Sequence, residues 1–208
     1  MKCLRFVSLL LLVALLGCKK TAGIFQLEGQ LYDDSFNQPL SGASVELYSV
    51  YSGTNQLSLV GTYTTSIDGK YHFSFPRTRT EKYILKVTKA LYFDQSLEIL
   101  YSNLHLKVMN TVNVHCSAKS WIKLRIVNTN PSASDHMQFI RQLGKSNCDE
   151  CCAGAVQHFY GAADTSIFCI NDGNFPYSIE YAVYNTSNSG ILSEVTVPFD
   201  TTTLYLTY

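Results

Sequence analysis

The 208-residue chain holds 16 Lys and Arg residues against 16 Asp and Glu residues, and only 15% of its residues are charged. This balance lacks the clustered positive charge that nucleic-acid binding requires, so we expect no nucleic acid among its partners. The chain is rich in Tyr (14) and Phe (11), and Thr, Ser and Val are frequent. Such residues favour half-buried β-strands over helices, so the composition predicts an all-β protein.

The N-terminal residues have the order of an export signal. Lys2 and Arg5 form a basic start, and the apolar segment over residues 6–16 is shorter than the about 20 residues that span a bilayer. The segment closes with Leu15-Leu16-Gly17-Cys18, which resembles the lipobox of bacterial lipoproteins. The resemblance implies cleavage before Cys18 and acyl chains, palmitate among them, in thioether and amide linkage on that cysteine. We therefore expect a signal peptide over residues 1–17.

The lipid would hold the rest of the chain on the exported side of a membrane. The leader contains two basic and no acidic residues, so removing it leaves a net charge of −2. Charge alone then gives no membrane attachment, and anchoring depends on Cys18, followed by a tether over residues 18–24. In many lipoproteins of the Bacteroidota an acidic run after the lipidated cysteine marks surface export, whereas the first acid here is Glu28. We expect an outer-membrane lipoprotein of the cell envelope, with the periplasmic face favoured over the cell surface.

Short runs of alternating apolar and polar residues follow the tether, the period-2 pattern of strands with one buried face. Phe25, Leu27 and Leu31 open this series. Asp68-Gly69 separates two β-like runs and is typical of a β-hairpin, because Gly takes the positive φ that such turns need. In chain order, the predicted strands of this part cover residues 25–31, 43–48, 57–65, 71–75, 83–87, 92–100 and 104–114.

Residues 25–115 resemble the carboxypeptidase regulatory-like domain, a transthyretin-like β-sandwich that is frequent in exported proteins of the Bacteroidota. The resemblance rests on four segments: GQLYD at 29–33, QPLSGASVEL at 38–47, TTSIDGKYHF at 64–73 and YILKV at 83–87. It implies structural roles: turns at Gly42 and Gly69, core packing by Ala43 and Val45, and aromatic packing by Tyr71 and Phe73. The sequence contains no His-x-x-Glu pair of a zinc carboxypeptidase, so the resemblance implies a fold and a compartment, not a reaction. We expect the first sandwich over residues 25–116.

A second β-sandwich, without an assigned family, is expected over residues 117–208. Ser117-Ala118-Lys119-Ser120 is the candidate boundary, and Trp121 opens a strand with Ile122, Leu124 and Ile126 on its buried face. We expect Trp121 itself to fill the core or the contact between the domains. Asn188-Ser189-Gly190 is a plausible hairpin turn. Further strands are predicted over residues 138–143, 155–160, 166–170, 177–184, 191–197 and 203–208.

The cysteines are the most distinctive candidate site. Cys3 leaves with the signal peptide and Cys18 takes the lipid, so five remain: Cys116, Cys148, Cys151, Cys152 and Cys169. An exported compartment is oxidising, and we therefore interpret these five first as disulfide cysteines that stabilise loops of the second domain. Because five is odd, at least one is free, modified or paired with another chain. The pairing stays open.

Two alternatives for the cluster remain. Cys148 and Cys151 have zinc-ligand spacing, with Cys152, His158 or Cys169 as further ligands. They also form a Cys-x-x-Cys pair of the kind found in redox proteins, although Asp149 and Glu150 would raise the thiol pKa and weaken the nucleophile.

Other polar and aromatic residues are interpreted structurally. Adjacent Asp33 and Asp34 point to opposite faces of a strand end and fit a turn better than a metal or acid–base pair. Three tyrosines invite comparison with a sugar-stacking platform, but core packing is favoured: Tyr177, Tyr181 and Tyr205. The histidines are scattered singly and predict no cluster.

The sequence therefore predicts a membrane-anchored, exported lipoprotein that acts as a non-catalytic binding or scaffolding module. We expect no catalytic residues, no bound metal and no cofactor, with a protein or a glycan as partner. The alternative is a metal-handling or thiol-redox lipoprotein that uses Cys148, Cys151 and Cys152.

Overall fold

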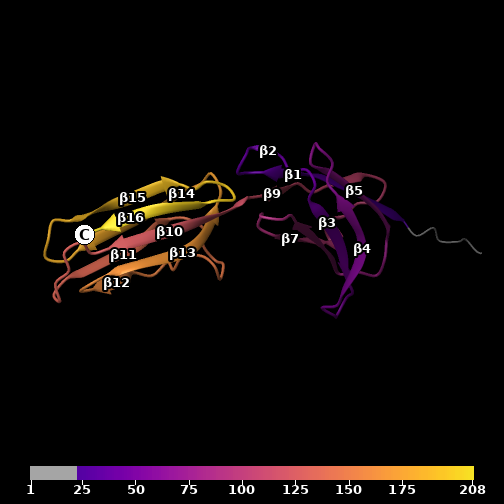
Figure 1. The fold of residues 1–208 in the computed structure, drawn as a ribbon. Helices are drawn as coiled ribbons and strands as arrows, with labels where there is room; N and C mark the ends of the chain where they lie inside the picture. The colour runs from indigo at the N-terminus through magenta and orange to yellow at the C-terminus, as the bar shows by residue number, and fades with distance from the viewer. Residues whose placement is uncertain (1–22) are drawn as a thin grey trace, which may run out of the picture.

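The computed structural model describes residues 23–208, which form two β-sandwiches arranged end to end (Figure 1). The predicted signal peptide, Cys18 and most of the tether lie outside these residues. The all-β prediction is confirmed, because the helical content of the described residues is one 3₁₀ turn, η1, Tyr101–Asn103. Each sandwich has its own apolar core, and the change from one core to the other falls between Ala118 and Ile122.

The first sandwich consists of a five-stranded sheet and a four-stranded sheet. In the larger sheet β1 is central: β2 and β5 pair with it antiparallel, and β8 and β9 pair with it parallel. The smaller sheet has the order β4-β3-β6-β7. The strands are β1 Ile24–Asp33, β2 Gln38–Pro39, β3 Ser44–Val50, β4 Leu57–Thr64, β5 Lys70–Pro76, β6 Lys82–Thr88, β7 Gln95–Leu100, β8 Met109–Thr111 and β9 Val114–Cys116.

Strict alternation builds the first core. In β1 the side chains of Phe25, Leu27 and Leu31 are buried, as the period-2 pattern predicts. Ala43 and Val45 are fully buried, and the Tyr71 and Phe73 rings pack 5.9 Å apart in the same core. These rings and aliphatic side chains fill the space between the two sheets.

The Asp68-Gly69 turn joins β4 to β5, but the predicted hairpin is wrong. The strand before the turn pairs with β3 and the strand after it pairs with β1, so the turn carries the chain from one sheet to the other. Gly69 has a φ of +71°, and a Cβ there would lie 2.6 Å from the carbonyl oxygen of Leu31. Only glycine fits this crossing.

The single strand predicted over residues 104–114 is divided into β8 and β9. Between them the Val112 carbonyl oxygen turns towards β1, where a Cβ on Gly29 would lie 1.7 Å from it. The Tyr71 hydroxyl donates to this same oxygen at 2.6 Å. The interruption therefore depends on a glycine in β1 and a tyrosine in β5.

The second sandwich has a three-stranded sheet, β13-β10-β16, and a four-stranded sheet, β12-β11-β14-β15. The first strand, β10, pairs antiparallel with β13 and parallel with the last strand, β16. The strands are β10 Lys119–Val127, β11 His136–Leu143, β12 Gln157–Tyr160, β13 Asp164–Asp172, β14 Pro176–Val183, β15 Ser189–Val195 and β16 Thr201–Thr207. The predicted hairpin is confirmed, since β14 and β15 pair directly, but its turn lies over residues 184–188, and Ser189 and Gly190 already belong to β15.

Trp121 fills neither core, so that part of the prediction is wrong. Alternation along β10 buries Ile122, Leu124 and Ile126 and leaves Trp121 half-buried on the opposite face of the sheet. The parity of a strand fixes which face a residue takes, whatever its size.

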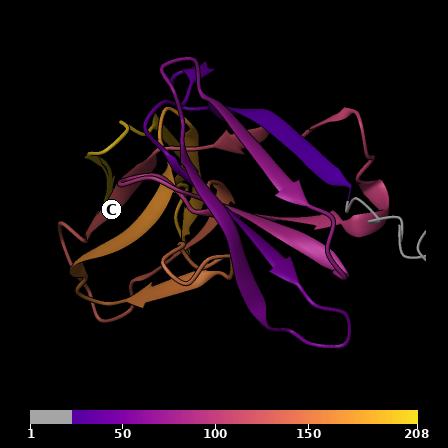
Figure 2. The same ribbon diagram turned by 90° about the vertical axis from the view of Figure 1, so that its right-hand side faces the viewer.

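The two sandwiches meet around the link between β9 and β10, and Figure 2 views the molecule with the first sandwich in front. The Ala118 amide donates to the Ser35 hydroxyl at 3.0 Å. The ring of Phe199 lies 5.8 Å from that of Phe36 and 5.6 Å from that of Tyr92, by ring centroids. Backbone, hydroxyl and aromatic contacts thus join the two units.

Candidate functional site

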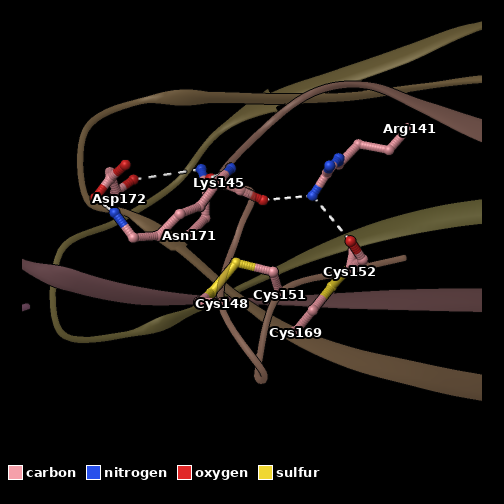
Figure 3. Close-up of a disulfide and its surroundings, with 8 residues drawn as sticks. All are labelled: Arg141, Lys145, Cys148, Cys151, Cys152, Cys169, Asn171 and Asp172. Atoms are coloured by element: carbon pink, nitrogen blue, oxygen red, sulfur yellow. Dashed lines mark hydrogen bonds and ion pairs between the residues drawn. A yellow bond between two sulfur atoms is a disulfide. The ribbon is translucent and has the colours of Figure 1, made fainter. Parts of the chain in front are cut away.

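Four of the five predicted disulfide cysteines form two bonds in the second sandwich (Figure 3). Cys148 is bonded to Cys151, and Cys152 is bonded to Cys169 of β13. The disulfide interpretation of the cluster is therefore confirmed, and the pairing is now assigned. With these sulfur atoms bonded to one another, the cluster offers no thiolate to a metal.

Polar contacts fix the loop that carries the disulfides, between β11 and β12. The Arg141 guanidinium donates to the carbonyl oxygens of Lys145 and Cys152 (Figure 3). The Lys145 ammonium lies 2.6 Å from the Asp172 carboxylate, and the Lys145 amide donates to the Asn171 side chain. The loop is therefore held at its start, at the disulfides and against the end of β13.

Cys116 is the remaining cysteine, free and buried. It lies at the end of β9, in the first core. Burial, with the nearby carboxylates of Asp34 and Asp33, raises the pKa of its thiol to about 11. At neutral pH the thiol stays protonated and is a poor nucleophile.

The outer face of the three-stranded sheet carries exposed rings beside cationic side chains. We call this set, Trp121, Lys123, Arg125, Phe168 and Tyr205, the aromatic–basic face. Lys123 lies opposite Phe168 across the β10–β13 ladder, and Arg125 lies opposite Tyr205 across the β10–β16 ladder. Phe168 is 64% exposed and Tyr205 is 68% exposed. The two rings lie on the strands either side of β10, so they flank the two cations on one sheet face.

Three contacts order the cations of the aromatic–basic face. The Lys123 ammonium lies 5.6 Å from the centroid of the Phe168 ring, within cation–π range. Arg125 donates to the Thr165 carbonyl oxygen and is paired with the Asp164 carboxylate. Because the Arg125 charge is neutralised locally, the face is suited to a neutral partner as well as an anionic one.

The disulfide loop forms one border of the aromatic–basic face. Cys151 pairs with Ile170 in a parallel bridge, and the Ile170 amide donates to the Glu150 carbonyl oxygen at 3.0 Å. Ile170 is 2% exposed although it has the outward parity of Phe168. The loop therefore covers the end of the face and holds β13 beside it.

The three tyrosines considered as a sugar-stacking platform do not lie on one face of the domain. Tyr177 is buried in the second core, and Tyr181 packs against that core, as favoured from the sequence. Tyr205 alone among the three points outwards, from β16. A shared platform of these three is excluded.

Asp33 and Asp34 point to opposite sides of the strand end, as their parity predicts. The Asp33 carboxylate is buried, accepts the amides of Ser35 and Phe36, and accepts the Tyr92 hydroxyl at 2.5 Å. The Asp34 carboxylate instead lies 2.7 Å from Nδ1 of His115. The turn interpretation is confirmed. Asp33 also binds Ser35 and Tyr92, two residues that contact the second sandwich.

Two histidines come together, contrary to the sequence prediction. Nε2 of His136 and Nδ1 of His158 lie 2.9 Å apart on the outer face of the four-stranded sheet. The His136 ring is stacked between Tyr160, at 4.3 Å, and Tyr184, at 3.9 Å. The sequence analysis began this strand at residue 138, which left His136 out, and could not give the register that makes β11 and β12 neighbours.

The same outer face is hollowed beside these rings. A hollow of about 410 Å³ is lined by polar and apolar side chains of β11, β14 and β15 and by Val156. Its apolar members include Ile140 and Ile191, of which Ile191 is 66% exposed. Across residues 23–208, no three His, Cys, Asp or Glu side chains gather as a metal site.

No family model matches the chain, and no curated protein matches it. Solved structures match it weakly. The TIE protein of Bacillus anthracis matches with a TM-score of 0.39 and 12% identity over 89% of this chain and 34% of that chain. The shaft pilin SpaA of Lactobacillus rhamnosus GG matches with a TM-score of 0.36 and 11% identity over 88% and 97% of the two chains.

A 3-chlorocatechol 1,2-dioxygenase from Rhodococcus opacus 1CP also matches, with a TM-score of 0.38 and 9% identity. The match covers 49% of this chain and 62% of that chain. The chain thus spans about a third of the TIE protein and less than two thirds of this dioxygenase. Among residues 23–208, no helix is long and apolar enough to cross a bilayer.

Proposed function

We propose that this protein is an exported lipoprotein, anchored through acyl chains on Cys18, that acts as a non-catalytic binding module for a glycan. Two sandwiches, the first of carboxypeptidase regulatory-like type, would carry the binding surface away from the membrane. The observation that supports the binding role is the aromatic–basic face.

The chemistry of this face favours a sugar. The apolar side of a pyranose packs on a flat ring, and its hydroxyl groups accept hydrogen bonds from ammonium and guanidinium groups. Phe168 and Tyr205 supply the rings, and Lys123 and Arg125 supply donors between them. The disulfide loop keeps β13 in place, so little ordering is required on binding.

The anchoring half of the proposal is tested by Cys18→Ala. In the native chain we expect metabolic labelling with a palmitate analogue and recovery in the outer-membrane fraction. The variant should lose both the label and the membrane association. A labelled variant, or a native chain without label, would refute lipid attachment at Cys18.

The binding half is tested by affinity electrophoresis of the full chain in gels that contain individual soluble polysaccharides. We expect at least one polysaccharide to retard it, with about fivefold weaker binding for Phe168→Ala or Tyr205→Ala, because each ring contributes about 1 kcal/mol. Tyr160→Ala is the matched control, since Tyr160 is 67% exposed on the other sheet. If no polysaccharide retards the chain, or if the control weakens binding equally, glycan binding by this face is wrong.

A further inference from the structure

The imidazole pair on the outer face of β11 and β12 has no part in the aromatic–basic face. Gln138 of β11 lies opposite His158 of β12, and His136 lies opposite Tyr160 two residues away. The two histidines are therefore diagonal neighbours on one face of one ladder. This register directs Nε2 of His136 and Nδ1 of His158 towards each other at 2.9 Å.

The surroundings hold one of these rings more firmly than the other. His136 is stacked on Tyr160 and Tyr184, with interplanar angles of 18° and 3°. The Tyr184 hydroxyl donates to the Gln138 side chain at 2.8 Å, which fixes the far ring of the stack. His158 is exposed and tilted 36° from His136, so it is free to turn.

We propose that His136 and His158 form a binding site for a divalent late transition metal, with Cu²⁺ as the preferred ion. Imidazole nitrogens are good ligands for such ions, and Cu²⁺ is the most strongly bound of the first-row series. Metal–nitrogen bonds of about 2.05 Å across a 2.9 Å separation give an N–metal–N angle of about 90°. That angle suits two adjacent corners of the tetragonal geometry of Cu²⁺ better than the tetrahedron of Zn²⁺.

Binding requires one rearrangement that the exposed ring permits. In the free pair a single proton lies between the facing nitrogens, so one of them donates and the other accepts. For metal binding the His158 ring tilts so that both lone pairs point to one metal position, while its Nδ1 stays near Nε2 of His136. The shared proton moves through solvent to the other nitrogen of the ring that held it. Both facing nitrogens then present lone pairs to the metal, and solvent completes its coordination.

The site is tested with full-length protein, purified in detergent and titrated with CuCl₂ in the presence of glycine to remove weakly held copper. We expect one bound Cu²⁺ per chain, a paramagnetic resonance spectrum with coupling to two imidazole nitrogens, and at least tenfold weaker Zn²⁺ binding. His158→Ala should lower the copper affinity at least tenfold. His136→Phe should do the same while keeping an aromatic ring in the stack.

His72→Ala is the matched control, because His72 is exposed on the first sandwich and contacts Gln26. It should bind copper as the native chain does. The proposal is overturned if the native chain retains no copper, if either pair variant retains as much as the native chain, or if Zn²⁺ binds more tightly than Cu²⁺. These readouts are independent of glycan binding, so either proposal can fail alone.

Discussion

The side-chain amide of Asn174, in the second sandwich, donates to the backbone carbonyl oxygen of Ser35, in the first, at 2.7 Å. The hydroxyl of the same Ser35 accepts the Ala118 amide. One small residue thus contacts both the link and the body of the neighbouring domain. Since each buried polar group here has its partner, the junction is a specific contact between the domains.

Phe199→Ala should loosen this junction without unfolding either sandwich. The ring contacts Phe36 and Tyr92, and losing about 1 kcal/mol of aromatic contact would make opening about fivefold more frequent. The measurement is the hydrogen-exchange rate of the Ala118 amide, which donates to the Ser35 hydroxyl across this junction. Phe168→Ala removes an exposed ring elsewhere in the domain and should leave the rate unchanged; equal acceleration in both variants would contradict the assignment.

The two disulfides should contribute unequally to stability. The Cys152–Cys169 bond spans 17 positions and the Cys148–Cys151 bond spans 3. By loop-closure entropy, replacing both cysteines of the longer loop by alanine costs about 3 kcal/mol, against about 2 kcal/mol for the shorter loop. Urea unfolding of the two double variants measures this, and a larger loss for the Cys148/Cys151 variant would show that loop length is not the controlling factor.

Two buried tyrosines should respond oppositely to removal of the hydroxyl. Burial raises the pKa of both, for Tyr177 to about 12. The Tyr71 hydroxyl donates to the Val112 carbonyl, so Tyr71→Phe should destabilise by about 1 kcal/mol. Within residues 23–208 the Tyr177 hydroxyl has no hydrogen-bond partner, so Tyr177→Phe should be neutral or stabilise by up to about 1 kcal/mol. The midpoints of urea unfolding measure both changes. A destabilised Tyr177→Phe variant would show that the Tyr177 hydroxyl has a hydrogen-bond partner after all.

Cys116 should be invisible to thiol reagents in the folded protein. Its thiol is buried and its pKa is raised to about 11, so unfolding in urea should add one thiol that reacts with a disulfide reagent at pH 8. In Cys116→Ala, unfolding should add none. Rapid labelling of the native chain would mean that the first core opens readily.

Much of the strand content was predictable, because apolar residues at alternating positions indicate both a strand and its buried face. Ile122, Leu124 and Ile126 are an example. Pairing was not predictable at the same level. Asp68-Gly69 predicts a sharp turn. The local sequence does not indicate whether the next strand pairs with the previous one or crosses to another sheet. That decision depends on Gly29 and Gly69, which admit close backbone contacts from distant residues.

The candidate sites show the same division between local and distant information. The cysteines predicted disulfides from the compartment alone, whereas their pairing required β13 to pass beside the loop. Trp121 was expected in the core or at the domain contact, whereas its parity in β10 places it on the outer face with Lys123. His136 and His158 meet only through the register of two strands separated by a long loop.

Each sandwich is closed by a parallel pairing between its first strand and its last: β1 with β8 and β9, and β10 with β16. The first sheet therefore cannot be complete until β9 has been synthesised, nor the second until β16 has been synthesised. During that interval the apolar faces of β10 and its partners stay uncovered and open to misassembly. Closure of the second sandwich thus waits for β16, whereas its four disulfide cysteines precede that strand, so the disulfides can form before the sheet is complete.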